Sequence, residues 1–241
     1  MLCSKGMNLH YVANDTSDRI LYPEMRWSRS HPRERVSWDD ALDRAASVFK
    51  SIIKKHGPDS VGFYVSGQSL TEEYYIANKL TKGFLGTNNI DTNSRLCMSS
   101  AVVGYKKTFG EDSVPISYAD IELADTFLIT GANPAWCHPI LFRRLEKHKE
   151  ENPEAKIIVV DPRKTDTANF ADLHLQLLPG TDVILYNAIG RCLYKRGLID
   201  EEFIKNHTQG FQDYKDLIFK TTLKQASKLC GVAEKDVRKA A

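Results

Sequence analysis

Cys97 is the residue of this sequence that is best suited to chemistry. It lies in the stretch NSRLCMSS, beside Met98 and two residues after Arg95. A nearby arginine favours the thiolate, which is the form of cysteine that attacks an electrophile or binds a metal. A structural cysteine normally lies in an apolar run, whereas Cys97 follows Asn93 and Ser94. Two interpretations are open from these residues: a reactive or metal-binding thiolate, and an ordinary cysteine at the start of a helix.

Three polar loops form a second group of candidate residues. They read GANPA, DPRKT and PGTD, and an aspartate that we expect to be exposed occurs in two of them. Glycine allows a ligand to approach the backbone closely, aspartate accepts hydrogen bonds from a ribose or guanine, and arginine pairs with phosphate. Glycine, proline and aspartate also simply make turns, and the chain has no G-x-G-x-x-G fingerprint. The residues concerned are Gly131, Gly180, Asp161, Asp182 and Arg163.

Alternating strands and helices precede and follow these loops. Apolar runs predict strands at 125–130, 155–160 and 173–178, and helical spacing predicts helices at 138–152 and 183–197, with a short helix near 168–171. Short connections between alternating strands and helices are typical of an α/β fold, with a Rossmann-like parallel sheet flanked by helices. The carboxyl ends of parallel strands meet at one edge, so the three loops should converge there and bind a nucleotide-like ligand.

The N-terminal part of the chain has a clear helix at 37–56. Ser37 is its expected N-cap and Gly57 ends it. A short strand at 60–66 and a helix from Thr71 to about Leu85 follow. Residues 1–36 have little periodicity, and we expect an extended, arginine-rich connection there.

Composition and cysteine usage exclude several classes of protein. The 241 residues carry a net charge of +2 with both signs interleaved, which indicates no nucleic-acid partner. No apolar run approaches the roughly 18 residues that span a bilayer, and the first residues lack the apolar core of a secretory signal. The five cysteines are widely spaced and form no C-x-x-C pair, which favours a reducing compartment over a disulfide scaffold. We expect Cys192 and Cys230 to lie in the core and the protein to be cytoplasmic.

Four blocks of the sequence resemble one family. LCSKG, NSRLCMSSAVVGY, ADTFLITGANPAWCHPI and IIVVDPRKTDTANFADLHLQLLPGTDVILYNAI occur in the order of the dimethyl sulfoxide reductase family of molybdenum oxidoreductases. These enzymes bind bis-molybdopterin guanine dinucleotide (bis-MGD). The nearest resemblance is to assimilatory nitrate reductase catalytic subunits, and it covers essentially the whole chain. It implies a portion of a longer enzyme that begins inside an iron–sulfur motif.

The resemblance also implies a division into domains of the formate dehydrogenase/DMSO reductase domains 1–3 type. Residues 1–36 would be the remnant of the N-terminal iron–sulfur domain. Residues 37–92 would be part of an α/β domain, and residues 93–241 would be the Rossmann-like domain that binds the pterin guanine dinucleotide.

The same resemblance gives roles to the residues around the metal. Cys97 matches the cysteine whose thiolate binds molybdenum, a metal that soft sulfur ligands suit. Met98 would border the substrate funnel, although ordinary packing explains it as well. Cys3 matches the last cysteine of a C-x2-C-x3-C…C [4Fe–4S] motif whose other cysteines are absent, so this chain cannot hold the cluster by itself. Lys5 matches a lysine between the cluster and the pterin.

The remaining site residues are carried over as cofactor contacts. Two of them match contacts to the pterin, and three segments match loops that bind the guanosine diphosphate end of the cofactor. The pterin contacts are Gln68 and Asn93; the loops contain Thr130, Gly131, Ala132, Asn133, Pro134, Ala135, Trp136 and Cys137, then Asp161, Arg163 and Thr165, then Gly180, Thr181 and Asp182.

If the resemblance holds, the reaction is oxygen-atom transfer at Mo-bis-MGD, in which nitrate, two electrons and two protons give nitrite and water. Electrons would come through the [4Fe–4S] cluster from ferredoxin, flavodoxin or an NAD(P)H-linked subunit. Formate dehydrogenase of the same family is the alternative, but there a histidine normally follows the metal-binding residue, where this chain has Met98. A non-catalytic nucleotide-binding module is a further alternative. We expect the isolated chain to be inactive.

Overall fold

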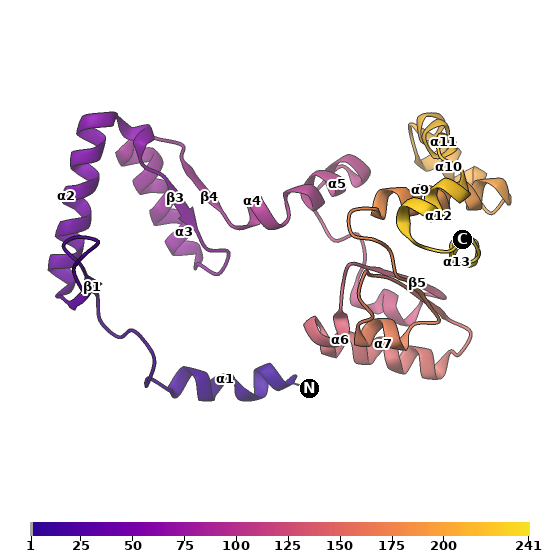
Figure 1. Ribbon diagram of the computed structural model, residues 1–241, viewed down its shortest axis with the longest axis horizontal. Coiled ribbons are helices and arrows are strands. Elements are labelled where there is room, and N and C mark those ends of the chain that lie inside the picture. Colours follow the sequence, from indigo (N-terminus) through magenta and orange to yellow (C-terminus); the bar gives the residue numbers. More distant parts are fainter. Residues whose placement is uncertain (1) are drawn as a thin grey trace. The chain divides into compact units, whose positions relative to one another are not determined.

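The structure is a computed structural model that describes residues 2–241 (Figure 1). Contacts between Cα atoms divide the chain into two compact units. One unit is Asn8–Pro115, and the other is Ile116–Ala241 together with the N-terminal residues up to Met7. The domain boundaries predicted after residues 36 and 92 stay a prediction.

Within Ile116–Ala241, three parallel strands form one sheet in the order β5-β6-β7. The residue pairs Thr126↔Lys156 and Ile158↔Leu173 fix its register. This confirms the α/β class. The strands are β5 (Thr126–Thr130), β6 (Lys156–Val160) and β7 (Leu173–Leu175).

The last strand is shorter than predicted. The expected strand runs to residue 178, but the chain turns after Leu175, where the N–H of Leu177 donates to the Leu175 carbonyl at 3.1 Å. The N–H of Leu178 donates to the carbonyl of Cys230 at 2.8 Å. A backbone group that pairs outside the ladder cannot continue the strand, so the apolar run overpredicted its length.

Helices connect the strands and cover both faces of the sheet (Figure 1). Pro134 begins a one-turn helix inside the first predicted loop, at the position where a missing N–H is not needed. The connecting helices are α6 (Pro134–Cys137), α7 (Pro139–Glu151), α8 (Asp166–Phe170) and α9 (Asp182–Lys195). The 3₁₀ helix η3 (Tyr118–Glu122) comes before β5, and α10 (Glu201–His207), α11 (Phe211–Phe219), α12 (Leu223–Cys230) and α13 (Glu234–Ala240) complete the unit.

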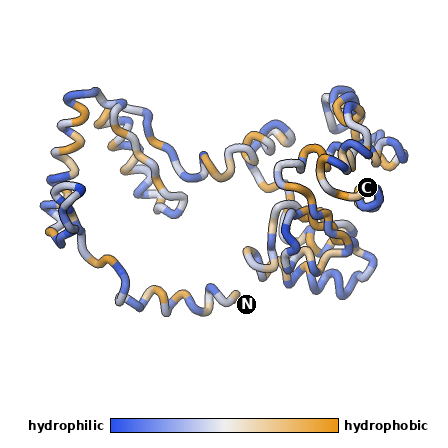
Figure 2. The backbone as a smooth tube through the Cα atoms, in the orientation of Figure 1, coloured by the Kyte–Doolittle hydropathy of each residue, from blue (hydrophilic) through white to orange (hydrophobic). Residues whose placement is uncertain are grey.

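The central strand β6 separates two hydrophobic clusters. Ile157 and Val159 are fully buried on the face that α7 and α8 cover. Ile158 and Val160 point to the opposite face, against α9, α12 and α13. In Figure 2, hydrophobic residues are correspondingly concentrated inside this unit. Each large aliphatic side chain buried here contributes about 1.5–3 kcal/mol, so β6 is the strand that fixes the sheet.

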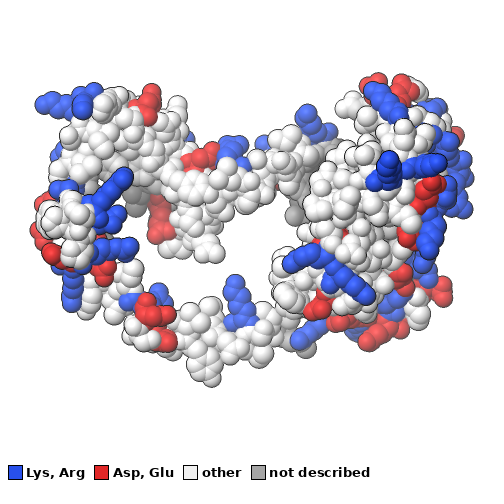
Figure 3. Space-filling view, viewed as in Figure 1, with Lys and Arg blue, Asp and Glu red and all other residues white. Residues whose placement is uncertain are grey.

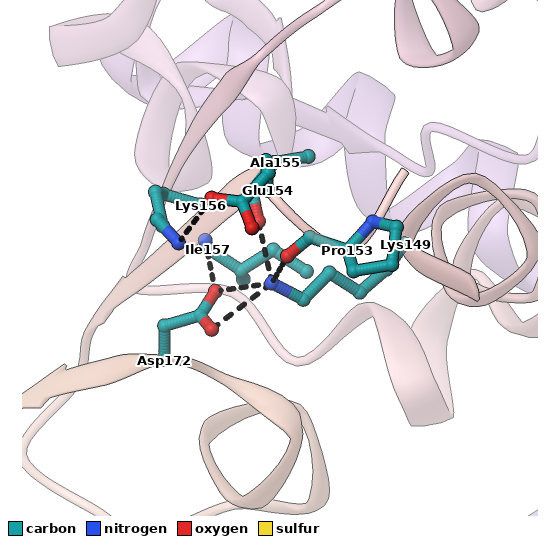
Figure 4. A network of polar contacts seen from close by, with 7 residues as sticks. All are labelled: Lys149, Pro153, Glu154, Ala155, Lys156, Ile157 and Asp172. Atoms are coloured by element: carbon teal, nitrogen blue, oxygen red, sulfur yellow. Dashed lines mark hydrogen bonds and ion pairs between the residues drawn. The ribbon is translucent and has the colours of Figure 1, made fainter. Parts of the chain in front are cut away.

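A polar network closes the amino end of the sheet (Figure 4). The Lys149 ammonium donates to both carboxylate oxygens of Asp172, at 3.0 and 3.1 Å, and to the carbonyls of Pro153 and Ala155. Asp172 also accepts the N–H of Ile157 at 2.7 Å. Burial opposes ionisation of Asp172, but this N–H and the Lys149 charge outweigh it and lower the pKa of the carboxyl. The network ties α7 to the starts of β6 and β7.

The Asn8–Pro115 unit contains a smaller pair of parallel strands. The helix predicted at 37–56 is confirmed, with the Ser37 side chain accepting the N–H of Asp40 and Gly57 following its last residue. Its apolar face is only partly covered, since Leu42 remains 60% exposed. The elements are α2 (Trp38–His56), η1 (Pro58–Ser60), β3 (Phe63–Val65), α3 (Thr71–Asn78), the π-helix η2 (Lys79–Leu85), β4 (Ile90–Thr92), α4 (Ser94–Cys97) and α5 (Ser99–Phe109).

The first 36 residues differ from the extended connection that we expected. They contain a helix, α1 (Ser4–Asn14), and two short antiparallel strands, β1 (Glu24–Met25) and β2 (Glu34–Arg35). Hydrophobic periodicity could not predict α1, because no residue of this helix is buried.

Charges of both signs intermingle on the face drawn in Figure 3, in agreement with the interleaved sequence. Among residues 2–241, no helix combines the length and the apolar character that a membrane span requires.

Candidate functional site

The three predicted loops leave the same edge of the sheet, because β5, β6 and β7 are parallel neighbours. Two of the loops bond to the end of the adjacent strand: the N–H of Gly131 donates to the Val160 carbonyl at 2.9 Å, and the N–H of Asp161 donates to the Leu175 carbonyl at 3.4 Å. Such an edge is where α/β proteins bind ligands.

Two glycines open this edge to a ligand. Gly131 has φ +57° and Gly180 has φ +80°, in the left-handed region that other residues adopt with strain. A Cβ atom at either position would lie in open space. The conformation, rather than crowding, therefore requires glycine, and the backbone of both loops is accessible.

The second loop is held mainly by its own polar groups. Asp161 is only 6% exposed, and its Oδ1 accepts the N–H of Arg163 at 2.7 Å. The expectation of an exposed Asp161 is wrong, because a carboxylate two residues before an N–H closes a local turn. The Gln176 side chain donates to the Pro162 carbonyl at 2.9 Å, and the Arg163 side chain remains exposed. Thr165 caps α8 by accepting the N–H of Ala168.

The third loop leads directly into α9. The Thr181 hydroxyl donates back to the Leu178 carbonyl at 2.6 Å and does not cap the helix. The thiol of Cys230 donates to the Thr181 carbonyl at 3.6 Å. Asp182 is the first residue of α9 and is half-buried. Its carboxylate suits the hydroxyl and amino donors of a ribose or guanine better than a phosphate.

The first loop, residues 130–137, is tied to two residues that the sequence analysis did not single out, Thr167 and Tyr186. The hydroxyls of Thr130 and Tyr186 are hydrogen-bonded. The Thr167 hydroxyl bonds the side chain of Asn133 and the backbone of the loop. Ala132 and Pro134 lie between these attachments, Ala135 supplies the bonded N–H, and Trp136 and Cys137 are exposed. The run DTANF, directly after DPRKT, was the available signal for Thr167.

A second group of candidates comes together in Asn8–Pro115. Gln68 follows β3 and Asn93 follows β4, and these strands are parallel with Val65 opposite Thr92. The N–H of Asn93 donates to the Val65 carbonyl at 3.3 Å. A Cβ atom on Gly67 would lie 2.6 Å from Asn93 Oδ1. The loops of Gln68 and Asn93 therefore share an edge of this small sheet.

Cys97 is exposed at the end of the one-turn helix α4. Asn93 Nδ2 lies 4.0 Å from its sulfur, and the Cys97 N–H donates to the Asn93 carbonyl at 3.1 Å. The arginine that was expected to favour a thiolate is engaged elsewhere, since Arg95 Nε donates to Asp91 Oδ2 at 2.8 Å. That bond lowers the pKa of the Asp91 carboxyl. The side-chain amide of Asn93 is thus a polar group within 4.0 Å of the thiol.

Met98 is 38% exposed and borders a hollow of about 370 Å³. The hollow lies between the end of β4 and α5, and its lining includes Ser94, Val102 and Lys106. The predicted role of Met98, bordering the substrate funnel beside the metal, stays a prediction.

Cys3 precedes the first residue of α1, and Lys5 lies exposed in its first turn. The pKa of the Cys3 thiol lies below its ordinary value, chiefly because the N–H of Gly6 bonds the sulfur. A thiolate is the form that an iron–sulfur cluster requires. Among residues 2–241, no three histidine, cysteine or acidic side chains cluster as a metal site. Cys3 could therefore supply one ligand at most.

The residues fit a guanine dinucleotide cofactor in two places. The loop edge of Ile116–Ala241 offers accessible glycine backbone, the Asp182 carboxylate as an acceptor and the exposed Arg163 as a donor, a set that suits a guanosine diphosphate. In Asn8–Pro115, the exposed Cys97 offers one soft sulfur donor with Asn93 beside it.

The chain is similar to known proteins in sequence and in structure. The family model "Molybdopterin oxidoreductase" matches residues 19–237. A nitrate reductase from Synechocystis sp. is 44% identical over 241 residues, covering the whole chain and 34% of the relative. An F420-dependent formate dehydrogenase subunit alpha from Methanocaldococcus jannaschii is 41% identical over 231 residues, covering 96% of this chain and 33% of the relative.

The solved structure of acetylene hydratase from Pelobacter acetylenicus superposes with a TM-score of 0.80 at 29% identity, over 99% of this chain and 32% of that one. The chain thus spans about a third of the length of these proteins. Their names describe different reactions, so the family alone leaves the substrate open. The matched span and the identity to curated relatives show that the chain belongs to the molybdopterin oxidoreductase family.

Proposed function

We propose that this chain is part of the catalytic subunit of a molybdenum nitrate reductase that carries bis-MGD and a [4Fe–4S] cluster. The observation that carries the proposal is the 44% identity, over the whole chain, to a relative named nitrate reductase. The Cys97–Met98 pair, which agrees with the nitrate reductase pattern, supports it.

The loop edge of Ile116–Ala241 would hold the guanosine diphosphate end of the cofactor. Asp182 would accept hydrogen bonds from the guanine or ribose, and Arg163 would pair with phosphate. The backbone at Gly131 and Gly180 would allow close approach. When bound, the cofactor supplies the two-electron chemistry by which nitrate loses an oxygen atom.

Around the metal, the chain's own residues would have distinct tasks. Cys97 would provide a thiolate ligand, and Asn93, 4.0 Å from its sulfur, would orient that ligand. Met98 would border the substrate path and exclude water beside the nitrate. Cys3 would be one ligand of the [4Fe–4S] cluster, and Lys5 would lie between the cluster and the pterin.

Formate dehydrogenase is the second candidate. The 41% identity to a formate dehydrogenase subunit favours it, because that value is close to the nitrate reductase figure. Methionine is a poor proton acceptor, however, and formate oxidation needs a base to take the proton. Met98 therefore favours nitrate.

The test uses the whole enzyme that contains this chain, purified from a molybdenum-replete host. Nitrate-dependent oxidation of reduced viologen and formate-dependent reduction of oxidised viologen are measured side by side, with Cys97→Ala as control. We expect nitrate turnover that Cys97→Ala abolishes. Formate turnover without nitrate turnover would reject the nitrate assignment. If the protein shows no turnover of either substrate and contains no molybdenum, the proposal that it is a molybdenum enzyme is rejected.

The electron donor and the compartment stay predictions. Ferredoxin, flavodoxin and an NAD(P)H-linked subunit all fit the proposed electron path, and the cytoplasmic location rests on the cysteine pattern.

A further inference from the structure

We propose that Thr167, assisted by Asp166, positions the loop 130–137 for the guanosine diphosphate end of the cofactor. The inference rests on the proposed function and assigns a task to residues outside the predicted contact set.

The Thr167 hydroxyl makes two hydrogen bonds to the loop. Its Oγ1 donates to Asn133 Oδ1 at 2.7 Å and accepts the N–H of Ala135 at 3.2 Å. Thr167 is fully buried, so water cannot replace either bond. One hydroxyl on α8 therefore fixes both a side chain and a backbone amide of a loop more than thirty residues earlier in the sequence.

A third bond joins the same two segments at the surface. Trp136 Nε1 donates to Asp166 Oδ2 at 2.6 Å. Trp136 is 72% exposed, so this bond orients an indole ring that packing alone does not hold. Asp166 and Thr167 are consecutive, which makes the start of α8 a two-point attachment for the loop.

Fixing Asn133 also fixes the turn that follows it. The Asn133 carbonyl accepts the N–H of Trp136 at 3.0 Å and that of Cys137 at 2.9 Å, and these bonds form α6. The side chain and the carbonyl of Asn133 are thus both engaged. The accessible backbone from Gly131 to Asn133 is held in one shape before a ligand arrives, and such preorganisation lowers the entropy cost of binding.

The experiment uses the whole enzyme made in a host that lacks the molybdenum cofactor, with GDP as the probe. Thr167→Val keeps the shape of the side chain and removes the hydroxyl, and Thr167→Ser restores the hydroxyl. Asp166→Ala releases Trp136 without touching the core, because Asp166 is exposed. Asp172→Asn is the matched control, since it weakens the same sheet at its opposite edge.

Calorimetry gives the GDP dissociation constant, and hydrogen exchange measured on peptides covering 131–137 reports the loop. We expect Thr167→Val to raise the dissociation constant about tenfold and to speed exchange at Ala135 by a similar factor. That factor is at the lower end of what the loss of the two buried hydrogen bonds predicts. Thr167→Ser should recover most of both values, and Asp166→Ala should weaken binding about threefold. Asp172→Asn should lower thermal stability while GDP affinity stays within twofold of wild type.

Unchanged GDP affinity in both Thr167→Val and Asp166→Ala would overturn the inference, even if the loop exchanged faster. If Thr167→Val does not fold, the GDP affinities of Asp166→Ala and Thr167→Ser test the inference instead. Wild-type GDP affinity in Asp166→Ala would then reject the role of the start of α8 in positioning the loop. A wild-type protein that binds no GDP, and that carries no guanine nucleotide when made in a cofactor-producing host, would overturn the proposed function and this inference with it. A failure of this inference alone is therefore distinguishable from a failure of the proposed function.

Discussion

Replacing Lys149 with methionine should destabilise the Ile116–Ala241 unit far more than a typical surface change. Methionine keeps the length and the apolar stem of lysine but removes the ammonium group. The variant loses the ion pair with Asp172 and the bonds to the carbonyls of Pro153 and Ala155 (Figure 4). Asp172 keeps the N–H of Ile157 as its remaining partner in the network.

The size of the effect follows from the number of contacts and their exposure. A hydrogen bond to a charged group contributes about 1.5–3 kcal/mol when it is buried. The side chains of Lys149 and Asp172 are 19% and 32% exposed, so water replaces part of what is lost. We therefore expect a loss of about 2 kcal/mol in the free energy of unfolding, which corresponds to about 30-fold in the unfolding equilibrium.

The effect should depend on pH with a definite sign. The pKa of Asp172 is lower in the folded protein than the ordinary value of about 3.9 for an aspartate. The stability that its ionised form contributes is thus complete above about pH 4 and is lost as the pH falls through the folded-state pKa. The difference between wild type and Lys149→Met should be largest at neutral pH and shrink in acid.

Hydrogen exchange of the Ile158 and Val159 amides measures this difference, because these residues are buried in the central strand and exchange when the sheet opens. Lys147→Met is the matched control, since Lys147 pairs with Glu151 on the same helix at 73% and 61% exposure. Exposed pairs contribute about 0–1 kcal/mol. Exchange in Lys149→Met no faster than in Lys147→Met, or a difference that does not shrink at low pH, would refute the reasoning.

Two further predictions concern glycine conformation and thiol reactivity. Gly180→Ala should cost about 1 kcal/mol and lower the unfolding temperature by about 2–4 °C, because φ is +80°; an unchanged temperature in a thermal scan would contradict this. In cofactor-free protein, iodoacetamide should label the exposed Cys97 and Cys137 first, whereas Cys192 and Cys230 should react only after unfolding, because burial raises the pKa of both thiols. Mass spectrometry of labelled peptides checks the order, and labelling of Cys230 as fast as that of Cys137 would contradict it.

Local signals in the sequence were sufficient to predict the structure where a residue contacts its near neighbours in the chain. Ser37 and Gly57 delimit their helix because caps depend on adjacent backbone groups. The convergence of the three loops followed from alternating strands and helices, since parallel strands can be connected in few ways. The burial of Cys192 and Cys230 followed from helical spacing and is confirmed.

The sequence was insufficient to predict the contacts of a residue whose partner lies far along the chain, or of a residue in a loop that bonds to itself. Thr167 bonds Asn133 across 34 positions, and no local pattern predicts that pairing. Asp161 looked available for a ligand, but its carboxylate closes the turn before Arg163. Arg95 looked like a partner for Cys97, but Asp91, four residues earlier in β4, pairs with its guanidinium. The type of residue suggested the chemistry, while competition among nearby partners decided which groups remained free.

The central claim of the proposed function is that Cys97 binds molybdenum. X-ray absorption at the molybdenum edge, recorded on the whole wild-type enzyme and on Cys97→Ala with matched molybdenum content, counts the sulfur neighbours of the metal. The account predicts that the variant has one sulfur neighbour fewer than wild type and no nitrate turnover. An unchanged sulfur count would show that another group holds the metal, and it would contradict the role given to Cys97.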